Sequence, residues 1–163
     1  MIDGLVLFYF FAIGAAVGSF LNVCIARWPM ELSVIRPPSR CPHCETPIKW
    51  YNNVPILAWA WLGGKCRNCR APISVVYPAV ELAVALGWLL TALHFGPTFT
   101  AVRVATFGTI MLGIAITDAR HYVIPDGFTV FGLLFVLATS VFSGLRGEIT
   151  PFAMPWDALI GAC

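Results

Sequence analysis

The chain has 163 residues, of which 59% are hydrophobic and only 11% are charged, and its mean hydropathy is +0.82. Because soluble domains carry about 25% charged residues, this composition excludes a soluble globular domain and indicates an integral membrane protein in a lipid bilayer. The net charge of +2 gives no sign of a nucleic-acid partner, and none is expected.

Four apolar stretches are long enough, or nearly long enough, to cross a bilayer as helices. We place them at residues 4–26, 78–96, 99–117 and 127–145, because about 20 apolar residues span the hydrocarbon core. The first stretch lacks the basic flank of a secretory signal, so it is expected to stay in the mature protein. Within it, Gly14 and Gly18 match the GxxxG helix-contact pattern, and Asn22 is a candidate for an interhelical hydrogen bond.

The loop at residues 27–77 carries seven of the ten Lys and Arg residues of the chain. The positive-inside rule therefore predicts that this loop is cytoplasmic. Because each span reverses the side of the membrane, the N-terminus is expected outside, residues 118–126 in the cytoplasm and residues 146–156 outside. The loop is rich in proline, which excludes long helices, and no internal repeat is evident.

Two CxxC motifs in this loop predict a metal site: Cys41 with Cys44, and Cys66 with Cys69. Each CxxC turn can aim both sulfurs at one zinc ion at about 2.3 Å. The alternatives are a disulfide cluster, which a reducing cytosol disfavours, and a zinc shell in which His43 competes as a ligand. Four cysteines would close the coordination shell, so the zinc is expected to be structural and to stabilise a loop too small to fold alone.

Three carboxylates at helix ends are candidate functional groups, because ionisable residues near the membrane are costly. Asp118 closes the third span, where the helix dipole disfavours an acid; the alternative is a surface Asp paired with Arg120 or His121. Asp126 occupies the expected N-cap position of the fourth helix, and Glu81 lies in an early turn of the second. Local helix stability is an alternative explanation for both.

Another apolar stretch begins at residues 156–160, and the sequence ends at Cys163 before that stretch could cross a membrane. We therefore expect a fragment that stops within a fifth helix. The predicted fold class is an all-α polytopic membrane protein with about four transmembrane helices plus a truncated fifth, and with a small zinc-ribbon-like cytoplasmic loop domain.

Ordered motifs along nearly the whole chain resemble the type IV prepilin peptidases, which also process type II secretion pseudopilins. These motifs are residues 18–23 (GSFLNV), 27–29 (RWP), 41–44 (CPHC), 48–55 (IKWYNNVP), 66–69 (CRNC), 73–74 (IS), 77–78 (YP), 81–82 (EL) and 117–126 (TDARHYVIPD). The resemblance implies an intramembrane aspartyl endopeptidase of the bacterial inner membrane that removes prepilin leader peptides at the cytoplasmic face. It also implies N-methylation of the new N-terminus with S-adenosylmethionine.

The resemblance assigns roles to individual residues. Asp118 would be the first catalytic aspartate, and Asp126 and Glu81 would support it. The four loop cysteines would bind the structural zinc. The domains would be transmembrane helix 1 at residues 1–26, the zinc-binding loop at 27–77 and an incomplete membrane peptidase domain at 78–163.

The second catalytic aspartate of that family lies in a GxGD motif, and no GxGD occurs in these 163 residues. A single aspartate cannot supply both the acid and the base of the reaction, so this chain alone is expected to be inactive. The rival hypothesis is a non-catalytic membrane adaptor, in which the zinc-ribbon loop docks partners of a pilus or secretion assembly.

Overall fold

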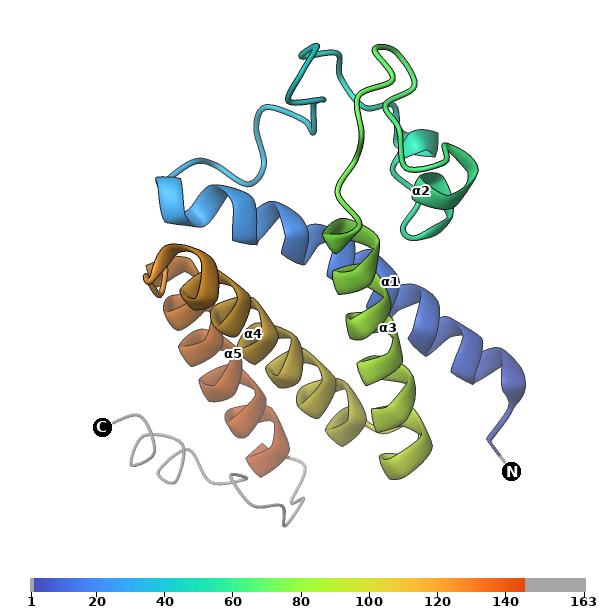
Figure 1. The fold of residues 1–163 in the computed structure, drawn as a ribbon. Helices are drawn as coiled ribbons and strands as arrows, with labels where there is room; N and C mark the ends of the chain where they lie inside the picture. Colours follow the sequence, from blue (N-terminus) through green and yellow to red (C-terminus); the bar gives the residue numbers. More distant parts are fainter. Residues whose placement is uncertain (1, 146–163) are drawn as a thin grey trace.

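The fold is that of a helical membrane protein, seen in a computed structural model that describes residues 2–145 (Figure 1). Its long helices are α1 (Gly4–Arg27), α3 (Val76–Phe95), α4 (Phe99–His121) and α5 (Asp126–Leu145). All four are long and apolar enough to cross a membrane, as the sequence predicts. Residues 2–145 form no β-strand, only two isolated β-bridges. The expected outer connection at 146–156 and the fifth helix lie outside the described residues.

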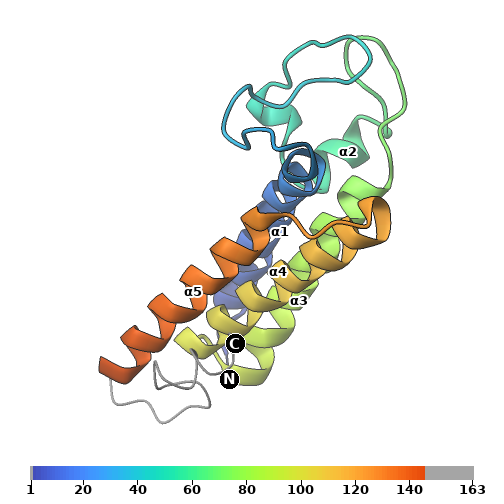
Figure 2. The same ribbon diagram turned by 90° about the vertical axis from the view of Figure 1, so that its left-hand side faces the viewer.

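The loop between α1 and α3 sits at one end of the bundle (Figure 1). It contains only short helices: η1 (Trp28–Met30), η2 (Trp50–Asn52) and α2 (Leu57–Trp61). This agrees with the exclusion of long helices by the prolines. In the bundle, α4 lies between α3 and α5 (Figure 2).

The α1 and α3 backbones come close together at two glycines of α1. A Cβ added at Gly14 would lie 2.8 Å from the Trp88 Cβ and 2.9 Å from the Ala85 Cα, and one added at Gly18 would lie 2.8 Å from the Glu81 Cα. The two backbones can approach this closely because neither glycine carries a side chain. The GxxxG pattern is therefore a helix-contact motif, as predicted.

Hydrogen bonds between polar side chains and neighbouring helices tie the bundle together. Asn22 of α1 donates to the Tyr77 carbonyl oxygen at 3.0 Å, which confirms the interhelical bond expected from the sequence. Trp88 of α3 donates through Nε1 to the buried Thr109 hydroxyl of α4 at 3.1 Å. In an apolar surrounding, such bonds satisfy groups that would otherwise be costly to bury.

The start of α5 packs against α4 and against Trp28 of η1, just after the end of α1. Phe128 of α5 is 2% exposed, and its ring lies against Gly113 of α4, where an added Cβ would be 2.5 Å from a ring carbon. The Trp28 and Phe128 rings meet edge to face with centroids 4.5 Å apart. A Cβ at Gly127 would lie 2.6 Å from the Trp28 ring. These contacts bring the ends of α1, α4 and α5 together below the loop.

Candidate metal centre and the carboxylates around it

The first CxxC motif forms a tight turn that holds Cys41 and Cys44 on one side of the backbone. The Cys41 N–H donates to the Thr46 carbonyl at 3.1 Å, and the Glu45 N–H donates back to the Cys41 carbonyl at 2.9 Å. Glu45 adopts a left-handed conformation, with φ of 54°. The turn therefore closes on itself through its own backbone.

The second CxxC motif repeats this geometry. The Cys66 N–H donates to the Ala71 carbonyl at 2.8 Å, the Arg70 N–H donates to the Cys66 carbonyl at 3.0 Å, and Arg70 has φ of 60°. Isolated antiparallel bridges flank both turns in the same way, at 40 with 47 and at 65 with 72. The sequences RCPHCETPI (40–48) and KCRNCRAPI (65–73) share their charge, cysteine, proline and isoleucine positions. The expectation of no internal repeat was therefore wrong at this short scale.

The two turns bring the four cysteine sulfurs together. The Sγ atoms of Cys41 and Cys69 are 3.8 Å apart, those of Cys44 and Cys66 are 4.0 Å apart, and all four lie within 4.8 Å of one another. Zinc–sulfur bonds of about 2.3 Å in a tetrahedron place sulfurs about 3.8 Å apart. The four cysteines can therefore hold one metal ion.

The alternatives to a four-cysteine site are not favoured by this geometry. The four loop cysteines are free thiols, with sulfurs too far apart for the bond of about 2.05 Å in a disulfide. His43 is exposed and lies outside the group of potential metal ligands found in residues 2–145.

Hydrogen bonding prepares two of the thiols for metal binding. Hydrogen bonds with the Thr46 side chain and backbone lower the pKa of Cys44 to about 5. Backbone hydrogen bonds from Cys69 and Asn68 lower the pKa of Cys66. Because the thiolate is the form that binds metal, a lowered pKa reduces the number of protons that must be released at neutral pH.

A tryptophan and a glycine form the small core beside the second turn. Trp59 donates through Nε1 to the Ile73 carbonyl at 3.1 Å. Gly64 has φ of 65°, and a Cβ there would lie 2.9 Å from the Trp59 ring. The buried Ala58 precedes Trp59 in α2. The position of the second turn thus depends on the Trp59 ring, which packs directly against Gly64.

Glu81, one of the three predicted carboxylates, connects this loop to the membrane helices. Its Oε2 accepts a hydrogen bond from the Ile56 N–H at 2.7 Å. Ile56 adopts φ of 63° and ψ of −52°, and the Leu57 N–H donates to the Pro55 carbonyl at 2.6 Å, so these residues form a γ-turn. A γ-turn of this hand is rare and strained, particularly at a β-branched residue. The carboxylate of α3 therefore holds an unusual backbone conformation in the loop.

A cavity of about 670 Å³ lies between the loop and the ends of α1 and α3. Its polar and charged lining comes from both sides. The helices contribute Ser19, Asn22, Arg27, Tyr77 and Glu81, and the loop contributes Arg40, His43, Lys49, Asn52, Asn53, Arg67 and Asn68, among others. This volume is in the range of small-molecule sites, and its lining offers both a carboxylate and several cationic groups.

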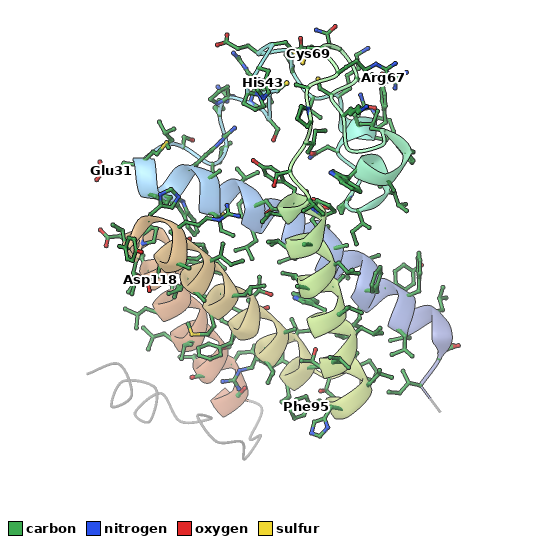
Figure 3. The ribbon with its side chains drawn as sticks, viewed as in Figure 1. Glu31, His43, Arg67, Cys69, Phe95 and Asp118 are labelled. Carbon is green, nitrogen blue, oxygen red and sulfur yellow. The ribbon has the colours of Figure 1, made fainter. Side chains whose placement is uncertain are left out.

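Asp118 lies in the last turn of α4, which extends beyond the predicted end of the span at residue 117. Its carboxylate is exposed, and within residues 2–145 it forms no ion pair with Arg120 or His121. The helix ends at His121, and the N–H of the C-cap residue Tyr122 donates to the Asp118 carbonyl at 2.8 Å. Asp118 is at the same end of the bundle as the cysteine turns, below the end of α1 (Figure 3).

Asp126 is the first residue of α5. The sequence predicts it as the N-cap, so it lies one position further into the helix than expected. It is exposed, and it precedes the Gly127 and Phe128 contacts with Trp28. Sequence reasoning did not single out Trp28 or Gly127 as a contact. The pairing joins residues about 100 positions apart, and no local pattern signals such a contact.

Together, the fold and the site define a polytopic helical membrane protein with four cysteines that could bind one metal ion and with exposed carboxylates at the same end of the helix bundle. Residues 12–95 match the family described as the bacterial peptidase A24 N-terminal domain. The chain belongs to this family, whose curated relatives are named prepilin leader peptidase/N-methyltransferase.

Three relatives illustrate the match. The prepilin leader peptidase/N-methyltransferase of Myxococcus xanthus is 40% identical over 94% of this chain and 44% of its own length. The type 4 prepilin-like proteins leader peptide-processing enzyme of Escherichia coli is 36% identical over 71% of this chain and 50% of its own. The prepilin leader peptidase/N-methyltransferase of Klebsiella pneumoniae is 32% identical over 91% of this chain and 72% of its own length. The chain thus spans about half the length of the first two, and no solved structure matches it.

Proposed function

We propose that this chain is the metal-binding N-terminal part of an enzyme that removes leader peptides from type IV prepilins or type II secretion pseudopilins. The observation that carries the proposal is the position of Asp118, which is exposed at the same membrane face as the four-cysteine loop. The names of the relatives support the same reaction.

In the proposed peptidase reaction, Asp118 is one of two carboxylates that act on the scissile peptide bond. One carboxylate, ionised, takes a proton from the attacking water, and the other, protonated, donates a proton to the departing amine. The second carboxylate is not among these 163 residues, which contain no GxGD. Asp126 begins the next helix, and we assign it a supporting role beside Asp118.

We assign the four cysteines to a structural zinc ion. Their sulfur separations fit a tetrahedral site, and four thiolates leave no position for a catalytic water. The zinc would then fix the two turns that lie over the cavity, and removing it is expected to loosen the loop without unfolding the membrane helices.

For the second half of the proposed activity, N-methylation, the cavity under the loop is the site we assign to the methyl donor. S-adenosylmethionine would supply the methyl group when bound. Glu81 and Asn22 from the helices and Asn52 from the loop line the cavity and offer hydrogen-bonding groups to a polar cofactor. Glu81 would then both hold the loop and contact the donor.

The proposed location is the bacterial inner membrane, with the loop and Asp118 in the cytoplasm and the N-terminus outside. The concentration of basic residues in the loop supports this orientation. A basic leader peptide with a hydrophobic segment behind it would reach Asp118 from the cytoplasmic side.

The proposal is tested by cloning the reading frame to its stop codon and expressing it with a prepilin-like substrate. Mass spectrometry of the substrate then reports leader removal and N-methylation separately. We expect a shortened product that carries one added methyl group. An intact substrate in membranes that contain the folded, zinc-loaded protein would contradict the enzyme and favour an adaptor.

A further inference from the structure

The outward face of α2 is apolar, although α2 belongs to the loop that carries most of the basic residues. Residues 54–62 (VPILAWAWL) contain no charged side chain. In α2, Leu57 is 57% exposed and Trp61 is 59% exposed, whereas Ala58 is buried. Leu57 and Trp61 are four residues apart, so they share one helix face. Such a face is unfavourable in contact with water.

The hydrogen bond to Glu81 fixes the depth of this face relative to the bilayer. With 20 residues, α3 is about 30 Å long, which equals the thickness of the hydrocarbon core. Glu81 lies in its second turn, about 8 Å from the start of the helix, and a helical side chain is directed toward the helix N-terminus, here toward the loop. Because the Ile56 N–H bonds to the Glu81 carboxylate at 2.7 Å, the residue that precedes α2 is held close to the start of α3. Figure 1 shows α2 just above the upper end of α3.

The surroundings of α2 suit an interface rather than the hydrocarbon core. The cysteine turn with Arg67 and Cys69 lies farther from the bundle than α2 does (Figure 3). Lys49 and Arg67 lie over the Tyr51 ring, at 5.9 and 5.7 Å from its centroid, and both are exposed. These three residues also line the cavity, and basic and aromatic side chains within one loop are typical of segments at the headgroup region of anionic lipids.

We propose that α2 lies in the headgroup region of the bilayer, with Leu57 and Trp61 at the acyl boundary. Apolar side chains are exposed on α3 as well, at Leu82, Leu86 and Leu90, where the lipid chains would lie. The lipid contact seats the metal-binding loop on the membrane surface. The loop that forms the outer wall of the cavity therefore cannot move freely away from the membrane.

The test uses the photoreactive amino acid p-benzoylphenylalanine in place of Trp61. The zinc-loaded chain is reconstituted in vesicles of phosphatidylethanolamine and phosphatidylglycerol, irradiated and analysed by mass spectrometry for phospholipid adducts. The matched control carries the same amino acid in place of His43, which is exposed on the first cysteine turn. We expect about tenfold more lipid adduct at position 61 than at position 43, since aromatic residues at this depth contact lipid.

A second measurement does not depend on the photoreactive residue. Lipids brominated near the top of the acyl chain should quench the fluorescence of the wild-type chain more strongly than that of Trp61→Phe, because the substitution removes a quenchable indole. Equal adduct yields at positions 61 and 43, or no loss of quenching in Trp61→Phe, would overturn the proposal. So would replacement of the lipid adduct at position 61 by an adduct with an added prepilin-like peptide, which would make this face a peptide-docking site.

Discussion

At the scale of single residues, Glu81 makes the contact that holds the loop to the membrane helices. Its carboxylate is the acceptor for a backbone N–H that sits in a γ-turn and has no other partner in the described part of the chain. Its backbone packs against Gly18 of α1. One residue thus connects the two membrane helices, through its backbone, with the metal-binding loop, through its side chain.

Glu81→Ala leaves the Ile56 N–H without its acceptor, so we expect the loop to open more readily by about 1–3 kcal/mol. Glu81→Gln keeps a carbonyl acceptor and should cost less, because only the charge is lost. Limited proteolysis within residues 32–55 should accelerate about tenfold or more in Glu81→Ala. The exposed Glu31 provides the control: Glu31→Ala should be cleaved at the wild-type rate, and equal rates in all three variants would refute the role of Glu81.

Gly63 and Gly64 form a matched pair at the second turn. Both have positive φ, 62° and 65°, but only at Gly64 would a Cβ meet the Trp59 ring, at 2.9 Å. Both alanine variants should lose about 1 kcal/mol of stability, because positive φ is unfavourable for a residue with a Cβ. Gly64→Ala adds an overlap of about 1–3 kcal/mol, because the Trp59 ring is held by its bond to Ile73.

The expected result is faster loss of metal to a chelator in Gly64→Ala than in Gly63→Ala. Equal rates would mean that the backbone conformation alone, and not the fit of the Trp59 ring, limits the second turn.

At the scale of elements, α1 and α3 are held together by close backbone contact. Gly18→Ala forces a Cβ to within 2.8 Å of the Glu81 Cα, a backbone atom that cannot move aside. We expect a loss of about 1–3 kcal/mol in the free energy of unfolding. Gly108→Ala in α4 enters open space and should be neutral or stabilising by up to about 1 kcal/mol.

Unfolding in mixed detergent micelles, followed by tryptophan fluorescence, separates the two glycine variants. A Gly18→Ala protein as stable as Gly108→Ala would show that the α1–α3 contact is looser than described.

The two cysteine turns are the second element-scale feature with a direct test. We expect one zinc ion per chain in the purified protein, and its loss in Cys44→Ser, since three sulfurs and a hydroxyl bind zinc far more weakly. Cys24→Ala, in the buried part of α1, should keep the metal. A metal content near zero in the wild-type protein, with the loop still resistant to protease, would contradict the site.

The elements differ in how readily the sequence predicts them. The four spans can be predicted from the length of the apolar runs. The contact of Gly14 and Gly18 with α3 can be predicted from the four-residue spacing of the two glycines on one helix. The cysteine group follows from the metal chemistry of its ligands. By contrast, the bond from Ile56 to Glu81 joins residues 25 positions apart and depends on a γ-turn, for which Ile is an unfavourable residue. The repeat of the two turns was visible in residues 40–48 and 65–73, but only when they are aligned on their prolines and isoleucines as well as their cysteines.

At the scale of the whole molecule, the candidate functional groups lie at one end of the helix bundle. The cysteine turns, the cavity beneath them and Asp118 all lie at the end of the bundle where α1 and α4 finish and α3 and α5 begin (Figure 3). The contacts of Trp28 with Gly127 and Phe128 bring the start of α5 up to this end. A substrate segment that emerges from the bilayer there would meet both the loop and the carboxylate.

The most direct test of the proposed function is the rate of leader-peptide cleavage by the complete reading frame carrying Asp118→Asn. Because the amide can act neither as base nor as acid, we expect the rate to fall by about 10²–10⁴-fold, with membrane insertion and zinc content unchanged. Asp3→Asn, on the exposed residue that precedes α1, is the control and should cleave at the wild-type rate. Wild-type cleavage by Asp118→Asn would contradict the account.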